Sequence, residues 1–129
     1  MSKRILVIDD EEAIRKSFVL ALEDTGYRID TADSGQKGLQ MQRAAPYDLI
    51  YLDLKMPGLN GVQTLREIRK DHRQVPVYIV TAFYEEFAEE LQQVADEGHA
   101  FQVLKKPIGN DQIVMATQGI LEGPVGWEP

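Results

Sequence analysis

Three aspartates stand where short apolar segments end, and their carboxylates could act together. Asp9 and Asp10 follow the apolar residues 5–8, and Asp53 closes the apolar and aromatic segment 47–53. An aspartate at the end of a buried strand contributes little to packing and is well placed for chemistry. Three carboxylates that lie close together repel one another. They therefore attract a hard cation such as Mg²⁺, which takes oxygen ligands and keeps several waters.

Two later residues could assist such a site. Thr81 ends the apolar segment 76–81, and Lys106 follows the apolar segment 100–104. If both lay near Asp53, this aspartate could attack a phosphoryl group and form an acyl phosphate. The metal ion, the ammonium group and the hydroxyl would then share the negative charge of the transferred oxygens. Together these residue types indicate aspartyl phosphate chemistry.

Short apolar segments alternate with segments of helical periodicity along the chain. Expected strands span residues 5–8, 27–32, 47–53, 76–81 and 100–104, and expected helices span residues 11–24, 34–45, 61–72, 84–97 and 111–121. Several of these strands are apolar on both faces, which is typical of parallel strands covered by helices on each side. The connections are too short for anything but crossovers. The alternation predicts an α/β fold with a parallel sheet wrapped on both faces.

The order of the strands decides whether the carboxylates meet. Parallel crossovers are right-handed. In a doubly wound five-stranded sheet of order 2-1-3-4-5, the winding reverses between the first and third strands, and a crevice opens there at their carboxyl ends. Asp9, Asp10 and Asp53 would lie at this crevice, with Thr81 and Lys106 on the next two strands. We therefore expect one site at one edge of the sheet.

The composition fits one acidic globular domain. The chain has 129 residues, 43% of them hydrophobic, a formal net charge of −7 and no cysteine. We expect a domain over residues 1–122 and an unpatterned tail over residues 123–129. The negative charge disfavours unaided binding to nucleic acid or anionic membranes. No apolar segment approaches the length of a signal peptide or a membrane span, so we expect a cytoplasmic protein.

Four short motifs resemble the receiver domain of two-component response regulators. They are ILVIDDE at residues 5–11, DLKMP at residues 53–57 with Gly61, Thr81-Ala82, and Lys106-Pro107. The resemblance covers the chain to about Leu121. It implies that Asp53 accepts a phosphoryl group from a sensor histidine kinase or a phosphotransfer protein, and from small donors such as acetyl phosphate.

The resemblance also implies which residues bind Mg²⁺. Asp10 would bind the metal directly and Asp9 mainly through water. Asp53 would contribute a carboxylate oxygen, and the main-chain carbonyl of Lys55 would supply a further ligand. The metal site expected from the resemblance therefore comprises Asp9, Asp10, Asp53 and Lys55.

For the phosphoryl group, the resemblance implies a hydrogen bond from Thr81 and an ion pair with Lys106. Lys106 is preferred over Lys105 because the family places its lysine directly before a proline. The resemblance also implies that the Lys106-Pro107 peptide bond is cis. The family often has Tyr or Phe three residues before this lysine, coupled to the threonine as a switch. Here that position is Val103, and the nearby Phe101 is not assumed to replace it.

The resulting hypothesis is a phosphorylation-switched binding module and not an enzyme, with self-catalysed phosphotransfer and dephosphorylation. We expect it to signal through a downstream protein target, a homodimer or onward phosphotransfer. Docking of the kinase or phosphotransfer protein is expected around Ile14, Pro107 and Ile108.

Other interpretations of the same residues remain open. The acidic run 9–12 could simply begin a helix, which favours negative charge, and Lys106 could be an ordinary surface residue. An aspartyl phosphate phosphatase would carry its nucleophile on the first strand, commonly with a second acid two residues later, where Glu11 stands. A flavodoxin-like mononucleotide binder would need a phosphate loop rich in Gly, Ser or Thr after the first strand. Sustained phosphomonoester hydrolysis would favour the phosphatase, and a bound flavin the nucleotide binder.

Overall fold

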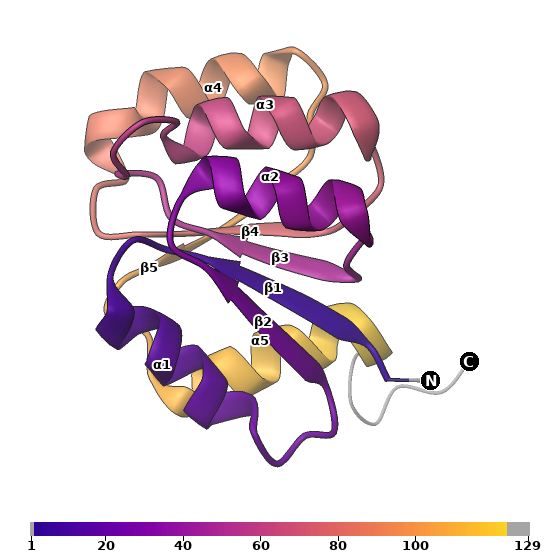
Figure 1. Cartoon of the computed structure of the whole chain (residues 1–129). Coiled ribbons are helices and arrows are strands. Elements are labelled where there is room, and N and C mark those ends of the chain that lie inside the picture. Colours follow the sequence, from indigo (N-terminus) through magenta and orange to yellow (C-terminus); the bar gives the residue numbers. More distant parts are fainter. Residues whose placement is uncertain (1, 124–129) are drawn as a thin grey trace.

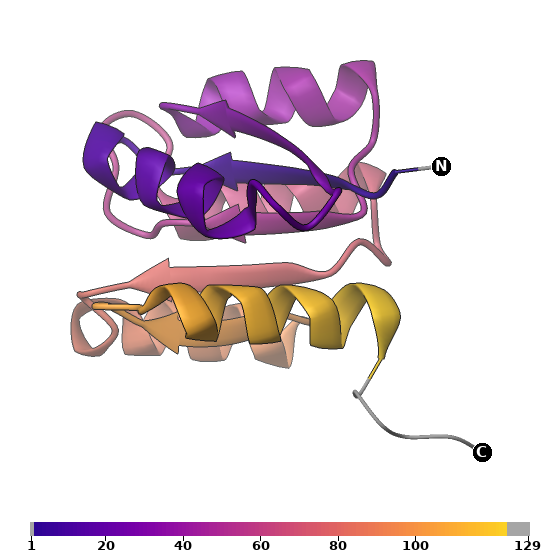
Figure 2. The ribbon, with the colours of Figure 1, turned by 90° about the horizontal axis from the view of Figure 1, so that it is seen from below.

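The computed structural model describes residues 2–123. It is a three-layer α/β structure in which one sheet lies between two layers of helices (Figure 1). The elements are β1 (Arg4–Ile8), α1 (Glu12–Leu22), β2 (Arg28–Ala32), α2 (Gly35–Ala44), β3 (Leu49–Leu52), α3 (Gly61–Asp71), β4 (Val77–Thr81), η1 (Glu85–Phe87), α4 (Ala88–Asp96), β5 (Gln102–Lys105) and α5 (Asn110–Glu122). Helices α2, α3 and α4 cover one face, and α1 and α5 lie side by side over the other (Figures 1 and 2).

All five strands are parallel, in the order β2-β1-β3-β4-β5. This confirms the predicted fold class and strand order. The pairing continues one residue past the strands: Asp53 N donates to Ile8 O at 2.9 Å, and Lys106 N donates to Thr81 O at 2.8 Å. The carboxyl ends of β1 and β3 therefore lie beside each other, as do those of β4 and β5.

The core lies on both faces of the sheet because side chains alternate along each strand. From β3, Ile50 and Leu52 pack toward α2, α3 and α4, whereas Leu49 and Tyr51 pack toward α1 and α5. None of these four side chains is more than 1% exposed. Each buried side chain of this size contributes about 1.5–3 kcal/mol, so β3 is a rigid support for the residue that follows it.

Two helix starts follow from local sequence. Ser34 caps α2, because its hydroxyl accepts a hydrogen bond from Lys37 N at 3.1 Å. A reciprocal capping box at α3 joins Asn60 and Gln63 through two 2.9 Å hydrogen bonds. Such caps satisfy main-chain groups that a helix terminus leaves free.

The single helix predicted over residues 84–97 is wrong in its first turn. The chain forms the 3₁₀ turn η1 and then α4, and Phe87, the last residue of η1, has φ −107° and ψ 7°. Phe87 is buried in the core beneath α4. Periodicity did not reveal the break because one turn of either helix type returns a side chain to the same face.

Arg69 of α3 lies buried at the opposite end of the sheet from Asp53. It is 4% exposed, and its guanidinium donates to the carbonyls of His72 at 3.1 Å, Val75 at 2.7 Å and Ala100 at 2.6 Å. One side chain thus joins the end of α3 to the loops that precede β4 and β5.

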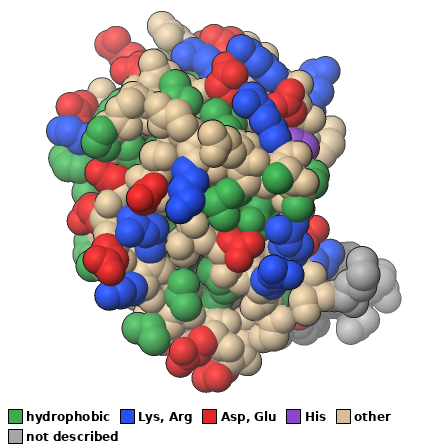
Figure 3. Space-filling model, viewed as in Figure 1, with side chains coloured by type: hydrophobic (Ala, Val, Ile, Leu, Met, Phe, Trp, Pro, Cys, Tyr) green, Lys and Arg blue, Asp and Glu red, His purple; other side chains and the backbone are tan. Residues whose placement is uncertain are grey.

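The last helix, α5, ends at Glu122. Most of the tail expected at residues 123–129 lies outside the described residues, so the domain boundary stays a prediction. Among residues 2–123, no helix combines the length and the apolar character that crossing a bilayer requires. Charged side chains of both signs are interspersed over the face shown in Figure 3.

Candidate functional site

The three aspartates meet at the carboxyl ends of β1 and β3. Asp9, Asp10 and Asp53 each offer a carboxylate oxygen, and these oxygens all lie within 4.8 Å of one another. Asp9 is 2% exposed and Asp53 is 4% exposed, whereas Asp10 is exposed to solvent. The cluster therefore has a closed side formed by the sheet and an open side at Asp10.

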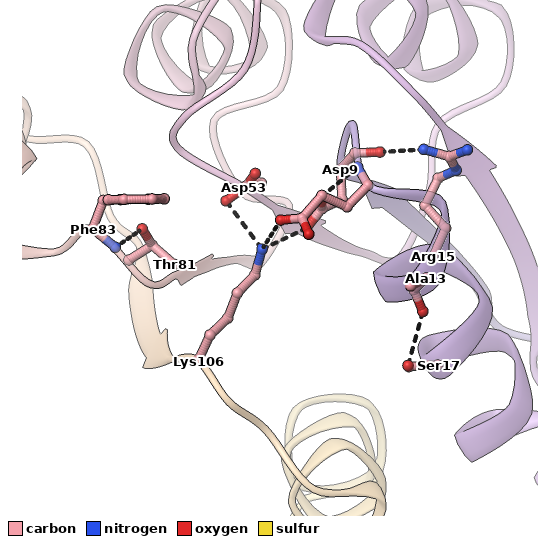
Figure 4. Close-up of polar contacts among 9 residues, drawn as sticks. Asp9, Ala13, Arg15, Ser17, Asp53, Thr81, Phe83 and Lys106 are labelled. Atoms are coloured by element: carbon pink, nitrogen blue, oxygen red, sulfur yellow. Dashed lines mark hydrogen bonds and ion pairs between the residues drawn. The ribbon is translucent and has the colours of Figure 1, made fainter.

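Lys106 reaches this cluster from the end of β5. Its Nζ lies 3.0 Å from Asp9 Oδ2, 3.5 Å from Asp53 Oδ1 and 3.7 Å from Glu11 Oε1 (Figure 4). Its side chain is only 12% exposed. The peptide bond between Lys106 and Pro107 is cis, as expected.

Lys105 takes a different direction, because successive side chains of a strand point to opposite faces. Its Nζ lies 3.9 Å from Glu85 Oε1 and 4.7 Å from the centroid of the Tyr84 ring. The structure thus brings Lys106 to the carboxylates and holds Lys105 against η1.

Burial destabilises the charged forms of Asp9 and Asp53. Burial raises the pKa of Asp53 to about 6, and the neighbouring charge of Asp9 adds to this effect, against the opposing charge of Lys106. Burial also raises the pKa of Asp9, although a main-chain hydrogen bond from Glu11 and the contact with Lys106 oppose the change. Burial alone would lower the pKa of Lys106, but its hydrogen bond to Asp9 and the charge of Asp53 outweigh this effect and raise it.

The donor set fits a hard divalent cation. Three carboxylates contribute more negative charge than one ammonium group neutralises, and the exposed Asp10 leaves room for the waters that Mg²⁺ retains. The side chain of Lys55 points elsewhere, since its Nζ lies 3.4 Å from Glu86 Oε2 and 4.4 Å from the centroid of the Phe83 ring. Only the main-chain carbonyl of Lys55 would therefore serve as a ligand.

Thr81 lies at the end of β4 and is fully buried. Its Oγ1 accepts a hydrogen bond from Phe83 N at 2.8 Å (Figure 4). A hydroxyl that accepts one bond can still donate its own hydrogen. The structure therefore shows Thr81 at the border of the site with its donor available, and not in a bond to Asp53. Val103 and Phe101 both pack against the core beneath α4.

Gly61 lets α3 begin directly against the main chain of Asp53. Its N donates to Leu54 O at 2.8 Å. A Cβ at Gly61 would lie 2.2 Å from Asp53 O and 2.7 Å from Leu54 Cα, so any larger residue must displace the main chain beside the candidate phosphoacceptor.

Two contacts of Asp9 were not predicted from the sequence. Glu11 N donates to Asp9 Oδ1 at 2.9 Å, and Arg15 Nη1 donates to Asp9 O at 2.8 Å. Both interactions hold the turn between β1 and α1 in place. The Arg15 contact reaches back six residues to a main-chain carbonyl before α1, so helical i to i+4 spacing does not indicate it.

Asp53→Asn is expected to stabilise the protein at neutral pH when divalent metal is absent. The folded pKa of Asp53, about 6, lies above its ordinary value of 3.8. The folded state therefore holds this proton more tightly, and the resulting stabilisation is lost as pH rises from 3.8 through about 6. Above that window, the free energy of unfolding of Asp53→Asn should exceed that of the parent protein by about 1–3 kcal/mol.

Urea denaturation at several pH values measures this difference. The exposed Asp33, which directly follows β2 at the same sheet edge, supplies the control variant Asp33→Asn. If Asp53→Asn is no more stable than the parent protein at neutral pH, burial and the charge of Asp9 do not destabilise the Asp53 carboxylate.

Comparison with known proteins identifies the family to which most of the chain is similar. The family profile described as "Response regulator receiver domain" matches residues 5–118. The Transcriptional regulatory protein QseB of Haemophilus influenzae is 32% identical over 126 residues, which are 96% of this chain and 55% of that protein. The Transcriptional regulatory protein ResD of Bacillus subtilis is 36% identical over 118 residues, covering 92% of this chain and 48% of that protein. The chain thus spans about half the length of these curated relatives.

Solved structures agree with this result. The chemotaxis protein CheY4 of Vibrio cholerae superposes with a TM-score of 0.82 at 26% identity, covering 94% of this chain and 100% of that one. A CheY-like response regulator receiver domain protein from Methanospirillum hungatei superposes with a TM-score of 0.83 at 25% identity, covering 95% and 97%.

Proposed function

The chain belongs to the family of response regulator receiver domains of two-component systems, and from this membership we propose that Asp53 is its phosphoacceptor. One observation supports the proposal above all others. Carboxylates from the ends of β1 and β3 converge with the ammonium group of Lys106 from β5 around a single point. In the proposed site Mg²⁺ is held by Asp9, Asp10, Asp53 and the Lys55 carbonyl.

In the proposed reaction, a carboxylate oxygen of Asp53 forms a bond to phosphorus while the bond between phosphorus and the donor's leaving group breaks. The bound metal supplies positive charge that neutralises the transferred oxygens. Lys106 exchanges part of its contact with Asp53 for a contact with the new phosphoryl group, and the Thr81 hydroxyl donates to it. Water later attacks the phosphorus, the bond between phosphorus and the Asp53 oxygen breaks, and inorganic phosphate leaves the restored carboxylate.

Receiver domains are signalling domains, and we propose that this one catalyses its own phosphotransfer and dephosphorylation without being an enzyme toward other substrates. The donor would be a sensor histidine kinase or a phosphotransfer protein. The signal would pass to a downstream protein target or a homodimer, with no contact to nucleic acid or membrane. The cytoplasmic location expected from the sequence stays a prediction.

An apolar groove beside the site suits the phosphoryl donor. Its volume is about 350 Å³, and its walls include Ile14 and Phe18 of α1, Pro107 and Ile108 after β5, and the stem of Lys106. A protein bound here would bring its phosphohistidine to the same edge of the sheet as Asp53. We propose this groove as the docking site for the histidine kinase or phosphotransfer protein.

Acetyl phosphate tests the proposed function directly. The protein should gain one phosphoryl group per chain by intact-mass measurement when Mg²⁺ is present, and none when the metal is chelated. Absence of labelling with Mg²⁺ present would contradict the proposal.

Asp10→Asn is expected to weaken Mg²⁺ binding by about tenfold or more, because a charged oxygen ligand is lost at the open side of the site. Calorimetric titration of the unphosphorylated protein measures the affinity. Glu12→Gln is the matched control, since Glu12 is an exposed acid at the start of α1 whose carboxylate pairs with Lys16 at 3.1 Å. Equal affinities for the parent and Asp10→Asn would remove Asp10 from the metal site.

A further inference from the structure

Strand β2 forms one edge of the sheet and leaves main-chain groups open there (Figure 1). Toward β1, Arg28 N donates to Lys3 O at 2.9 Å. At the other end of the strand, Ala32 O accepts a hydrogen bond from Asp9 N at 3.1 Å. Successive residues of a strand direct their N–H and C=O groups to opposite sides, so those of Ile29 point away from β1. An open edge of this kind can pair with a strand of another chain.

Exposed apolar side chains of α1 lie beside this edge. Leu20 is 61% exposed and Val19 is 37% exposed, and together with Thr31 of β2 they line a hollow of about 400 Å³. We call Val19 and Leu20 the apolar strip. The other edge strand, β5, carries the exposed Lys105, a type of residue that discourages pairing with a further strand. Open main-chain groups and an apolar strip thus coincide at β2.

The charges of β2 are complementary to those of a second copy of the same strand. Arg28 and Asp30 lie two residues apart, so their side chains share one face of the sheet. Arg28 is exposed and has no ion-pair partner within residues 2–123. Asp30 Oδ2 lies 3.7 Å from Arg4 Nη2, but the Asp30 side chain is still 30% exposed. If two copies of β2 run antiparallel with Ile29 opposite Ile29, each Arg28 lies opposite Asp30 of the other copy.

We propose that two copies of this chain associate through β2, antiparallel about a two-fold axis at Ile29, and join their sheets into one. The two Ile29 residues exchange two main-chain hydrogen bonds, as directly opposed residues of an antiparallel pair can. Arg28 and Asp30 form two symmetric ion pairs on one face of the sheet, and the apolar strips of the two copies cover each other on the opposite face. A two-fold dimer requires such a self-complementary surface. No phosphoryl group takes part, so the association does not depend on the chemistry proposed at Asp53.

Sedimentation equilibrium of the unphosphorylated protein tests the association. The interface is small, so the dimer should form only above about 0.1 mM, and the protein should be a monomer at about 1 μM. Arg28→Asp and Asp30→Arg should each raise the dissociation constant at least about tenfold, because like charges then lie opposite each other. An equimolar mixture of the two variants should restore the parent affinity, because every charge at these positions then meets its opposite.

Leu20→Lys leaves β2 unchanged and should also raise the dissociation constant about tenfold, because it places a charge in the apolar strip. Met115→Lys is the matched control, since Met115 is 72% exposed on α5, and it should dimerise like the parent. Circular dichroism establishes that each variant folds. If Asp30→Arg does not fold, because Asp30 also accepts a hydrogen bond from Tyr47 OH, the comparison of Leu20→Lys with Met115→Lys decides the case.

A parent protein that stays monomeric at about 1 mM would overturn the inference. A mixture of Arg28→Asp and Asp30→Arg that associates no more tightly than either variant alone would also overturn it. Loss of the dimer in Met115→Lys but not in Leu20→Lys would assign the association to α5 and remove β2 from the interface.

Discussion

Asp53→Asn is expected to abolish the acyl phosphate that acetyl phosphate and Mg²⁺ form on the parent protein. An amide keeps the shape of the side chain but has no anionic oxygen to attack phosphorus. Asp53 is 4% exposed and its Oδ1 lies 3.5 Å from Lys106 Nζ, whereas Glu11, which also approaches this ammonium group, is exposed to solvent. Labelling should therefore fall to the background of the assay.

Intact-mass measurement before and after mild base treatment detects the phosphoryl group, because acyl phosphates are labile to base. Asp33→Asn is again the control, since it removes an exposed carboxylate from the same edge of the sheet and should label like the parent. Base-labile labelling of Asp53→Asn at the parent level would place the phosphoacceptor elsewhere, while leaving the family and the fold unaffected.

Arg69→Met is expected to lower the free energy of unfolding by about 3–5 kcal/mol. Methionine fills much of the same volume but donates no hydrogen bond, so the carbonyls of His72, Val75 and Ala100 lose the guanidinium that serves all three. Removing one member of a buried polar arrangement leaves the others unsatisfied, and the resulting penalty exceeds the value of the hydrogen bonds themselves.

Urea denaturation at neutral pH measures this loss. Arg28→Met, at an exposed position, should change stability by less than about 0.5 kcal/mol. The free energy of unfolding of Arg69→Lys should lie between those of Arg69→Met and Arg28→Met. An ammonium group keeps the charge but cannot reproduce the planar fork of donors. An Arg69→Met variant as stable as Arg28→Met would show that water replaces the guanidinium at these carbonyls.

The local patterns in the sequence were sufficient for most of the architecture. Apolar segments such as residues 5–8 and 76–81, separated by helical periodicity, predicted the parallel sheet and its order because crossover chirality leaves few alternatives. The same reasoning placed Asp9, Asp10 and Asp53 at one crevice, where the structure brings them together. Residue type and strand-end position are local properties that a sequence displays directly.

The tertiary structure alone decided what each of these side chains touches. The contacts of Lys106 with Asp9 and Asp53 cross 97 and 53 residues of chain, and its preference over Lys105 came from a family resemblance before geometry supported it. By contrast, the hydrogen bond from Phe83 N to Thr81 Oγ1 is local, since it spans only two residues. The break before α4 accompanies the burial of Phe87 in the core.

Arg69 shows the limit most clearly. In the sequence it is one basic residue among fourteen lysines and arginines. Its spacing from Val62 and Leu65 puts it on the apolar face of α3, but nothing in that spacing names the partners of its guanidinium. Its burial follows from the two loops before β4 and β5, which meet only when these strands pair and α3 packs over them. Periodicity predicts which face of an element is apolar, but the partners of a polar group are set by distances between elements, and those distances exist only in the folded chain.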